Sequence, residues 1–165
     1  MTTLTAAPLT STPRSGVHTP DQLLDIAHLF AHDWRLNALA SISRDHAERH
    51  WIELASIPAV QVWAIAWPSG TGTGWHDHGI ASGAFVVVSG ALVEQAWHDG
   101  VRRTDLTDGQ GKGFGADHVH DVQNLGSELA VSVHAYSPTL TDMTRYELQG
   151  DRLHRLGVDT AGDAW

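Results

Sequence analysis

The stretch Gly70–His78 reads GTGTGWHDH and places two histidines one residue apart, directly after a series of glycines. Successive side chains of a β-strand point to opposite faces of the sheet, so His76 and His78 would lie on the same face. Two imidazoles on one face can bind the same divalent metal ion. Further histidines follow downstream as His118, His120 and His134. The spacing predicts a metal ion held inside a small β-barrel.

The composition is that of one globular domain with its own core, because the chain has 165 residues of which 42% are hydrophobic and 18% charged. The net charge of −9 argues against nucleic acid as a partner, since binding to phosphates requires basic patches. No apolar stretch is long enough to suggest a membrane span. The lack of cysteine excludes disulfides and thiolate ligands and favours a cytoplasmic location. We expect a disordered leader at residues 1–18 and a single domain at residues 19–165, of unknown oligomeric state.

Helices are expected before the barrel, at about residues 20–56. Thr19 is a favourable N-cap residue, and Pro20 suits the first helical position. A second helix is expected from about Arg44 to Leu54, before Pro58. Short strands between glycine-rich turns then predict a mainly β fold, an antiparallel barrel or jelly roll at about residues 60–148. The expected strands are Val60–Trp67, Ala84–Val88, Ala91–Trp97, His118–Val122 and Glu128–Tyr136, with a loop at Lys112–Gly115 and a polar surface tail after Tyr146.

The third metal ligand is ambiguous from periodicity alone, because His118 and His120 would share one face. Two features help to decide it: the glycine spacing around Gly70–His78, and Asn124, which follows His120 by four residues. Together they resemble the two signature motifs of the cupin superfamily, a family of metal-binding β-barrels. That resemblance selects His120 as the ligand and leaves His118 beside the site.

The resulting ligand set is His76, His78 and His120, without an acidic residue. Many cupins have a glutamate ligand shortly after the His-x-His pair, but residues 79–84 contain no carboxylate. Three neutral ligands would leave the metal its full positive charge. Such a site favours an anionic ligand such as a thiolate.

Four segments between Trp63 and Pro138 carry a more specific pattern. They are HDH at 76–78, GAF at 83–85, HDVQN at 120–124 and SVHAYSP at 132–138. The pattern resembles the cysteine dioxygenase family of thiol dioxygenases, specifically its bacterial members. The resemblance implies Fe(II) on the three histidines, a small thiol or thione and dioxygen as partners, and a sulfinate product.

The last segment resembles the family's hydrogen-bonded relay, which implies catalytic roles for Ser132, His134 and Tyr136. Period-two spacing would direct all three into the barrel. Alternatively, these buried polar groups only satisfy one another. Animal members have a cysteine, crosslinked to the tyrosine, where this chain has Gly83, so Tyr136 is expected to be unmodified.

Two different residues, Glu53 and Arg49, are candidates for binding the substrate. The family uses an arginine or glutamine on the helix before the barrel, and counting back from Trp63 places Glu53 there, with Trp51 nearby. Glu53 would attract a cation, and tryptophan faces such as Trp51 and Trp75 bind ammonium groups. A cationic or betaine thiol such as cysteamine or ergothioneine would then fit. If Arg49, one helical turn earlier, fills the role, a substrate like cysteine or 3-mercaptopropionate fits instead.

The sequence therefore predicts an Fe(II)-dependent thiol dioxygenase with a cupin-type barrel. One alternative is a metal-binding cupin without catalytic activity, acting as a sensor or carrier of a small ligand. Another is a metal-dependent oxygenase or isomerase that acts on carbon. The relay that ends at Tyr136 favours the first reading, because a protein that only binds a ligand does not need it.

Overall fold

A computed structural model describes residues 17–160, so the expected leader lies almost wholly outside the described residues. The described chain forms two helices followed by ten strands. The elements are α1 (Pro20–Phe30), α2 (Arg35–Ser43), β1 (His50–Ile57), β2 (Val60–Trp67), β3 (Ser82–Ser89), β4 (Ala91–Trp97), β5 (Val101–Thr107), β6 (Gly111–Phe114), β7 (His120–Gln123), β8 (Ala130–Ser137), β9 (Asp142–Gln149) and β10 (Arg152–Thr160). Within residues 17–160, no helix is long and apolar enough to cross a membrane.

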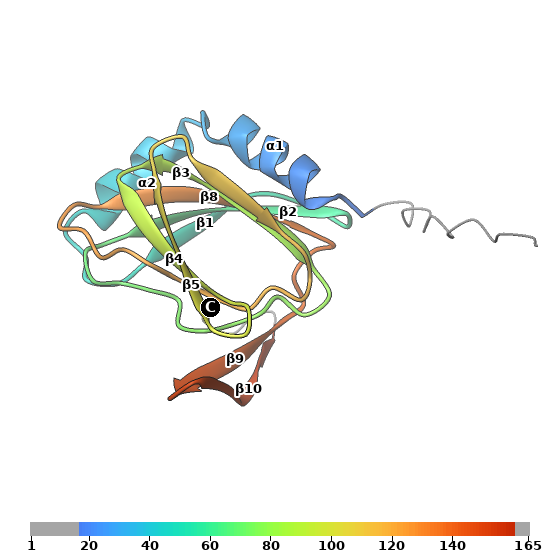
Figure 1. Cartoon of the computed structure of the whole chain (residues 1–165). Coiled ribbons are helices and arrows are strands. Elements are labelled where there is room, and N and C mark those ends of the chain that lie inside the picture. The colour runs from blue at the N-terminus through green and yellow to red at the C-terminus, as the bar shows by residue number, and fades with distance from the viewer. Residues whose placement is uncertain (1–16, 161–165) are drawn as a thin grey trace, which may run out of the picture.

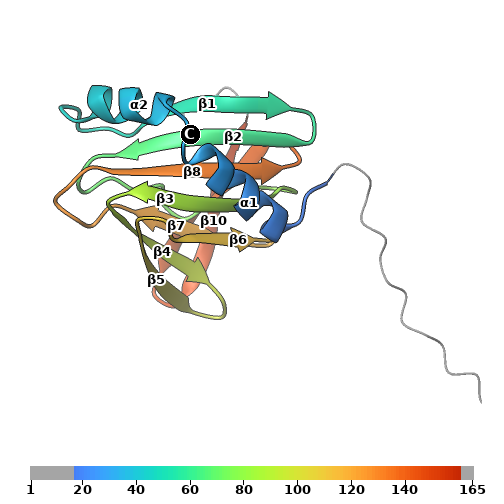
Figure 2. The same ribbon diagram turned by 90° about the horizontal axis from the view of Figure 1, so that it is seen from above.

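The largest sheet has five antiparallel strands in the order β1-β2-β8-β3-β6, and both helices cover its outer face (Figures 1 and 2). Alternate residues of β2 point to that face, where Val62, Ala64 and Ala66 are fully buried with Leu23 of α1. Thr19 caps α1 as predicted, in a reciprocal capping box with Gln22. The aliphatic layer fixes the helices on one side and leaves the other side of the sheet for the site.

The inner face of this sheet packs against a three-stranded sheet in the order β5-β4-β7. The core between them is rich in aromatic side chains, including Trp67, Phe85 and Phe114, and it includes Leu92 of β4. The two sheets enclose a barrel-like interior. The predicted fold class, a mainly β antiparallel cupin-type barrel with an N-terminal helical segment, is confirmed.

Strands β9 and β10 form a separate two-stranded hairpin below the barrel (Figure 1). The segment after Tyr146 lies mostly at the surface, as expected, but it is not an irregular tail, because its residues belong to paired strands. The hairpin is tied to the segment before β3, since the Asp77 amide donates to the Thr144 carbonyl and the Tyr146 amide donates to the Trp75 carbonyl. The last strands thereby contact the His-x-His segment.

The helix expected from Arg44 to Leu54 is also wrong. Helix α2 ends at Ser43, and β1 pairs with β2 so that Trp51 lies opposite Ile65 and Glu53 opposite Trp63. The apolar spacing fits a helix locally, but pairing with a neighbouring strand gives the backbone its hydrogen bonds. The expected loop at Lys112–Gly115 is mostly strand β6, for the same reason.

Candidate metal centre

Three histidines meet in the barrel interior, although His120 lies far from His76 and His78 in the sequence. An antiparallel bridge joins His76 to His120, with each amide donating to the other's carbonyl at 2.9 Å. The ring centroids of His76, His78 and His120 lie 4.8 to 5.0 Å apart, and all three residues are buried. One ring nitrogen from each lies within 4.8 Å of the others, which suits binding of one metal ion.

The hydrogen bonds leave the Nε2 atoms of two of these rings free. His76 Nδ1 donates to the Gly74 carbonyl at 2.9 Å, since a carbonyl can only accept. His120 Nδ1 lies 2.8 Å from Glu94 Oε1 and donates to it. Each neutral ring therefore keeps a lone pair on Nε2, the atom available to a metal.

His78 gives the strongest indication that a metal fits here. Both of its ring nitrogens are buried and have no hydrogen-bond partner among the described residues. A buried polar group without a partner is costly, so it calls for a ligand. Burial lowers the pKa of His78 well below its ordinary value, and neighbouring histidines lower it further, so the ring is held in its neutral, ligating form.

A second cluster contains both His118 and His120. Glu94 Oε1 accepts from both His118 Nε2 and His120 Nδ1 at 2.8 Å, and Oε2 accepts from Lys112 at 2.5 Å. His118 thus belongs to a group with Glu94 beside the three-histidine set, and His120 belongs to both. Sequence reasoning missed Glu94, although an acidic residue within the apolar stretch of β4 was a visible signal.

The residues Ser132, His134 and Tyr136 of β8 form the expected chain of contacts. Ser132 Oγ lies 2.8 Å from His134 Nε2, and Tyr136 Oη lies 3.3 Å from His134 Nδ1. Trp67 Nε1 donates to Ser132 Oγ at 2.8 Å. Period two on β8 directs all three side chains to the same face, as predicted.

The indole of Trp67 fixes the direction of this chain, because it can only donate. Ser132 is fully buried, so its own hydrogen needs an acceptor, and His134 Nε2 is the acceptor within reach. His134 Nδ1 then donates to Tyr136 Oη, which frees the phenol hydrogen for the pocket. Burial lowers the pKa of His134 to about 3, which keeps the ring neutral, and burial raises the pKa of Tyr136.

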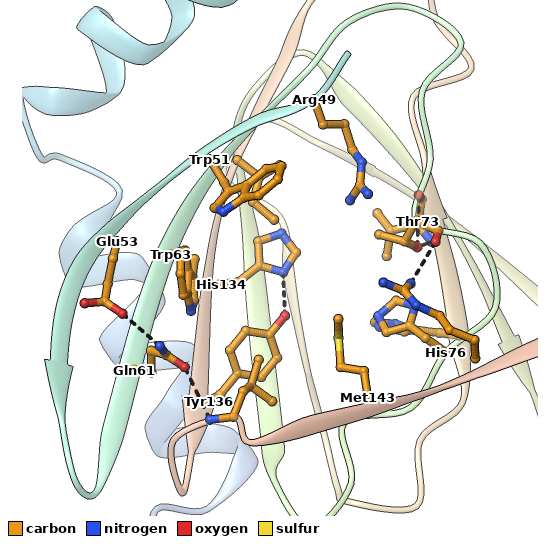
Figure 3. A pocket seen from close by; sticks show the side chains of 15 residues that line it. Arg49, Trp51, Glu53, Gln61, Trp63, Thr73, His76, His134, Tyr136 and Met143 are labelled. Atoms are coloured by element: carbon orange, nitrogen blue, oxygen red, sulfur yellow. Dashed lines mark hydrogen bonds between the residues drawn. The ribbon is translucent and has the colours of Figure 1, made fainter. Parts of the chain in front are cut away.

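A pocket of about 370 Å³ lies against two of the three histidines and against the outer end of the relay, whereas His78 is not part of its lining (Figure 3). Its lining includes His76, His120, His134 and Tyr136. Three of the four predicted substrate residues, Arg49, Trp51 and Glu53, also line it, from β1 and the residue before it rather than from a helix. The fourth, Trp75, is not part of the lining; it packs edge-on against Trp97, at 6.4 Å between ring centroids. Trp75 precedes the inward-facing His76 and so points the other way.

The charged groups of the pocket differ in their partners. The guanidinium of Arg49 points into the pocket and lies 5.3 Å from the Trp67 ring centroid, and it forms no hydrogen bond or ion pair with any side chain between residues 17 and 160 (Figure 3). Glu53 accepts a hydrogen bond of 2.8 Å from Gln61. Arg145 pairs with Asp159 at 2.6 Å. Arg49 is therefore the cation with free donors.

Several lining residues were not predicted. Gln61, Trp63 and Ile65 alternate along β2, so period two could have identified them. Met143 and Arg145 come from β9, where no site residue was predicted. Nothing in the local sequence indicates that this hairpin forms a wall of the pocket.

Solved structures with the same architecture include TT1209 from Thermus thermophilus, with a TM-score of 0.52 and 17% identity over 58% of this chain and 88% of that one. An uncharacterized conserved protein with a double-stranded β-helix domain from Klebsiella pneumoniae has a TM-score of 0.51 and 17% identity over 67% of this chain and 86% of that one. The Cnp3 cupin domain of Schizosaccharomyces pombe has a TM-score of 0.50 and 10% identity over 55% and 61% of the two chains. These likenesses concern the fold alone.

The double-sheet barrel with a buried histidine cluster defines the chain as a cupin with a candidate metal site. The family model for cysteine dioxygenase type I matches residues 21–149. The chain belongs to that family. The match includes all three histidines, the relay and all of β9.

Proposed function

We propose that the protein is an Fe(II)-dependent thiol dioxygenase that converts a small thiol to a sulfinate. The observation that carries the proposal is the His78 ring, whose two buried nitrogens lack partners beside two other rings with free Nε2 atoms. Iron(II) held by His76, His78 and His120 would supply the redox chemistry by which both atoms of dioxygen are added to a thiolate sulfur. The sum, RS⁻ + O₂ → RSO₂⁻, needs no external reductant.

The charge balance of the site favours an anionic sulfur ligand. The three histidines are neutral, and Glu94 lies behind His120, where it contacts Nδ1 and not the metal-facing Nε2. A dication among neutral ligands therefore keeps its charge, which stabilises a thiolate. Apolar and aromatic lining residues exclude water and strengthen this interaction.

The relay supplies a hydrogen-bond donor at the reaction site. Neutral His134 orients the Tyr136 hydroxyl, and the phenol hydrogen is free to donate to oxygen or to the substrate. Because burial raises the pKa of Tyr136, the hydroxyl stays protonated and acts as a donor rather than as a base. A donor fixed before the reaction stabilises negative charge as it develops.

The substrate we favour carries a carboxylate that pairs with Arg49. This guanidinium has free donors in the pocket, whereas Glu53 is already engaged by Gln61. A betaine thione such as ergothioneine also meets this condition, since it carries a carboxylate. Its cation can in addition stack on the ring of Trp51. A thiol with a cation and no carboxylate, such as cysteamine, is the less favoured alternative.

The test is a thiol panel with the iron-loaded full chain: cysteine, 3-mercaptopropionate, cysteamine and ergothioneine. We expect uptake of one dioxygen per sulfinate formed with at least one of them, and both atoms of labelled dioxygen in the product. The metal-stripped chain is the control. Absence of oxygen uptake with every thiol would refute the proposed enzymatic activity. Binding of a thiol without oxygen uptake would instead favour a sensor or carrier.

The charge preference is tested by the matched variants Arg49→Met and Glu53→Gln. Loss of a charge-assisted hydrogen bond costs about 1.5–3 kcal/mol, so Arg49→Met should raise KM for carboxylate thiols about tenfold to hundredfold. Glu53→Gln should leave KM for those substrates nearly unchanged. The reverse result, with Glu53→Gln impairing a cationic thiol, would overturn the assignment of Arg49.

A further inference from the structure

A polar cluster that the proposed chemistry does not use lies directly behind the His120 ring. It consists of Glu94 from β4, Lys112 from β6 and His118 from the loop before β7. Glu94 has no exposed surface, whereas the Lys112 side chain is 32% exposed. The cluster thus runs from the metal site to the protein surface.

Glu94 is the centre of this cluster and receives three hydrogen bonds. One oxygen accepts from His118 and His120 at 2.8 Å each, and the other accepts from Lys112 at 2.5 Å. A buried carboxylate remains charged only when its oxygens are satisfied in this way.

The carboxylate acts on His120 through the ring. Accepting the Nδ1 hydrogen fixes the tautomer and makes Nε2 a stronger electron donor. Lys112 and His118 donate to the same carboxylate, so they weaken the hydrogen bond that it accepts from His120 Nδ1. His76 differs in this respect, because its Nδ1 donates to the neutral Gly74 carbonyl, and His78 has no such partner among the described residues. His120 is thus the ligand whose donor strength depends on a charged pair.

We propose that Glu94 and Lys112 are positioning residues with opposite effects, which together set the donor strength of His120 and hence the affinity and reduction potential of the bound metal. The inference rests on the metal site of the proposed function and not on the oxidation of a thiol. Glu94 strengthens His120 as a ligand and stabilises the more highly charged ion. Lys112 opposes both effects.

The test compares Glu94→Gln with Lys112→Met, using anaerobic titration with Co²⁺ and Fe²⁺ and the midpoint potential of the iron-loaded chain. Glu94→Gln should weaken metal affinity about 10- to 100-fold and raise the potential. Lys112→Met should tighten affinity and lower the potential. A purely structural role would weaken binding in both variants, so the opposite signs are the diagnostic result.

Asp121→Asn is the matched control, because Asp121 is next to His120 in sequence and buried, but its carboxylate bonds to Thr73 and Gln123. We expect this variant to shift affinity and potential less than Glu94→Gln does. Lys112→Met keeps the test decisive if Glu94→Gln does not fold, since Lys112 is partly exposed. Equal shifts in Glu94→Gln and Asp121→Asn, or shifts of the same sign in Glu94→Gln and Lys112→Met, would overturn the inference. No metal binding by the unaltered chain would refute the metal site itself.

Discussion

The ring of His78 lies between those of Phe114 and Tyr136, at centroid separations of 5.1 and 5.0 Å. The aromatic neighbours hold the ring in place by shape, while its nitrogens have no polar partner among the described residues. Side chains around it are therefore arranged for a ligand rather than for a hydrogen bond. The local sequence was enough to predict that His76 and His78 share a face, because residues two apart on an extended chain point in the same direction.

Tyr136→Phe separates catalysis from metal binding. The change removes the one hydroxyl that the relay directs to the pocket and keeps the ring. We expect iron content to be unchanged and the rate of thiol oxidation to fall about 100-fold, as for removal of one fixed donor. The measurement is oxygen uptake normalised to bound iron. A variant with the full rate would exclude a role of the phenol in catalysis.

The metal-free protein should lose stability on acidification. The unfolded chain protonates His134 near pH 6.5, whereas burial lowers its pKa in the folded state to about 3. Between these values the unfolded state binds more protons, so the free energy of unfolding falls as pH falls. The slope is up to about 1.4 kcal/mol per pH unit for each such histidine.

Urea unfolding at pH 7.5, 6.5 and 5.5 with a chelator measures this slope. His134→Gln should reduce it, and His28→Gln on the exposed face of α1 should not. Stability that stays constant from pH 7.5 to 5.5 would contradict the buried neutral state of the ring.

At the scale of elements, five of the ten observed strands were predicted: β2, β3, β4, β7 and β8. The bounds expected for β2 and β4 are those observed, because each is an apolar run that ends at a turn. β1, β5, β6, β9 and β10 were missed. β1 was expected as a helix and β6 as a loop, and both are strands only through their pairing with β2 and β3. Arg145 could not be assigned to the site for a related reason, since the pairing of distant strands brings it there, whereas Glu94 was visible as an acidic residue within β4.

Gly83→Ala tests how tightly β3 packs against the end of β6. A Cβ at this position would lie 2.5 Å from the Phe114 ring and 3.0 Å from Tyr136. Overpacking of this kind costs about 1–3 kcal/mol in the free energy of unfolding. Gly115→Ala, where a Cβ meets nothing within 4 Å, is the control. Equal stability of the two variants in urea would show that Phe114 moves aside freely.

On the scale of the whole molecule, metal binding and folding should be coupled. The three ligands come from the segment before β3 and from β7, so the site exists only in the folded chain. A metal at 100 times its Kd should therefore stabilise the fold by about 2.7 kcal/mol.

Thermal unfolding with and without Co²⁺ or a chelator measures this coupling. His78→Leu should abolish the metal-dependent rise in Tm, and it should not destabilise the metal-free protein, because it removes two unsatisfied polar atoms. His28→Leu should retain the full rise. If the metal stabilised His78→Leu as much as the unaltered chain, binding would occur elsewhere.

The attachment of the β9–β10 hairpin has a consequence for biosynthesis. Asp77, between the first two ligands, accepts a hydrogen bond of 2.7 Å from the Tyr146 hydroxyl, and Arg145 donates to the Thr73 carbonyl at 3.1 Å. The ribosome makes the segment that contains His76 and His78 before it makes Arg145 and Tyr146, the residues that bind this segment. A nascent chain can thus form the barrel strands before β9 covers the pocket, so the pocket is completed only after Arg145 and Tyr146 have been made.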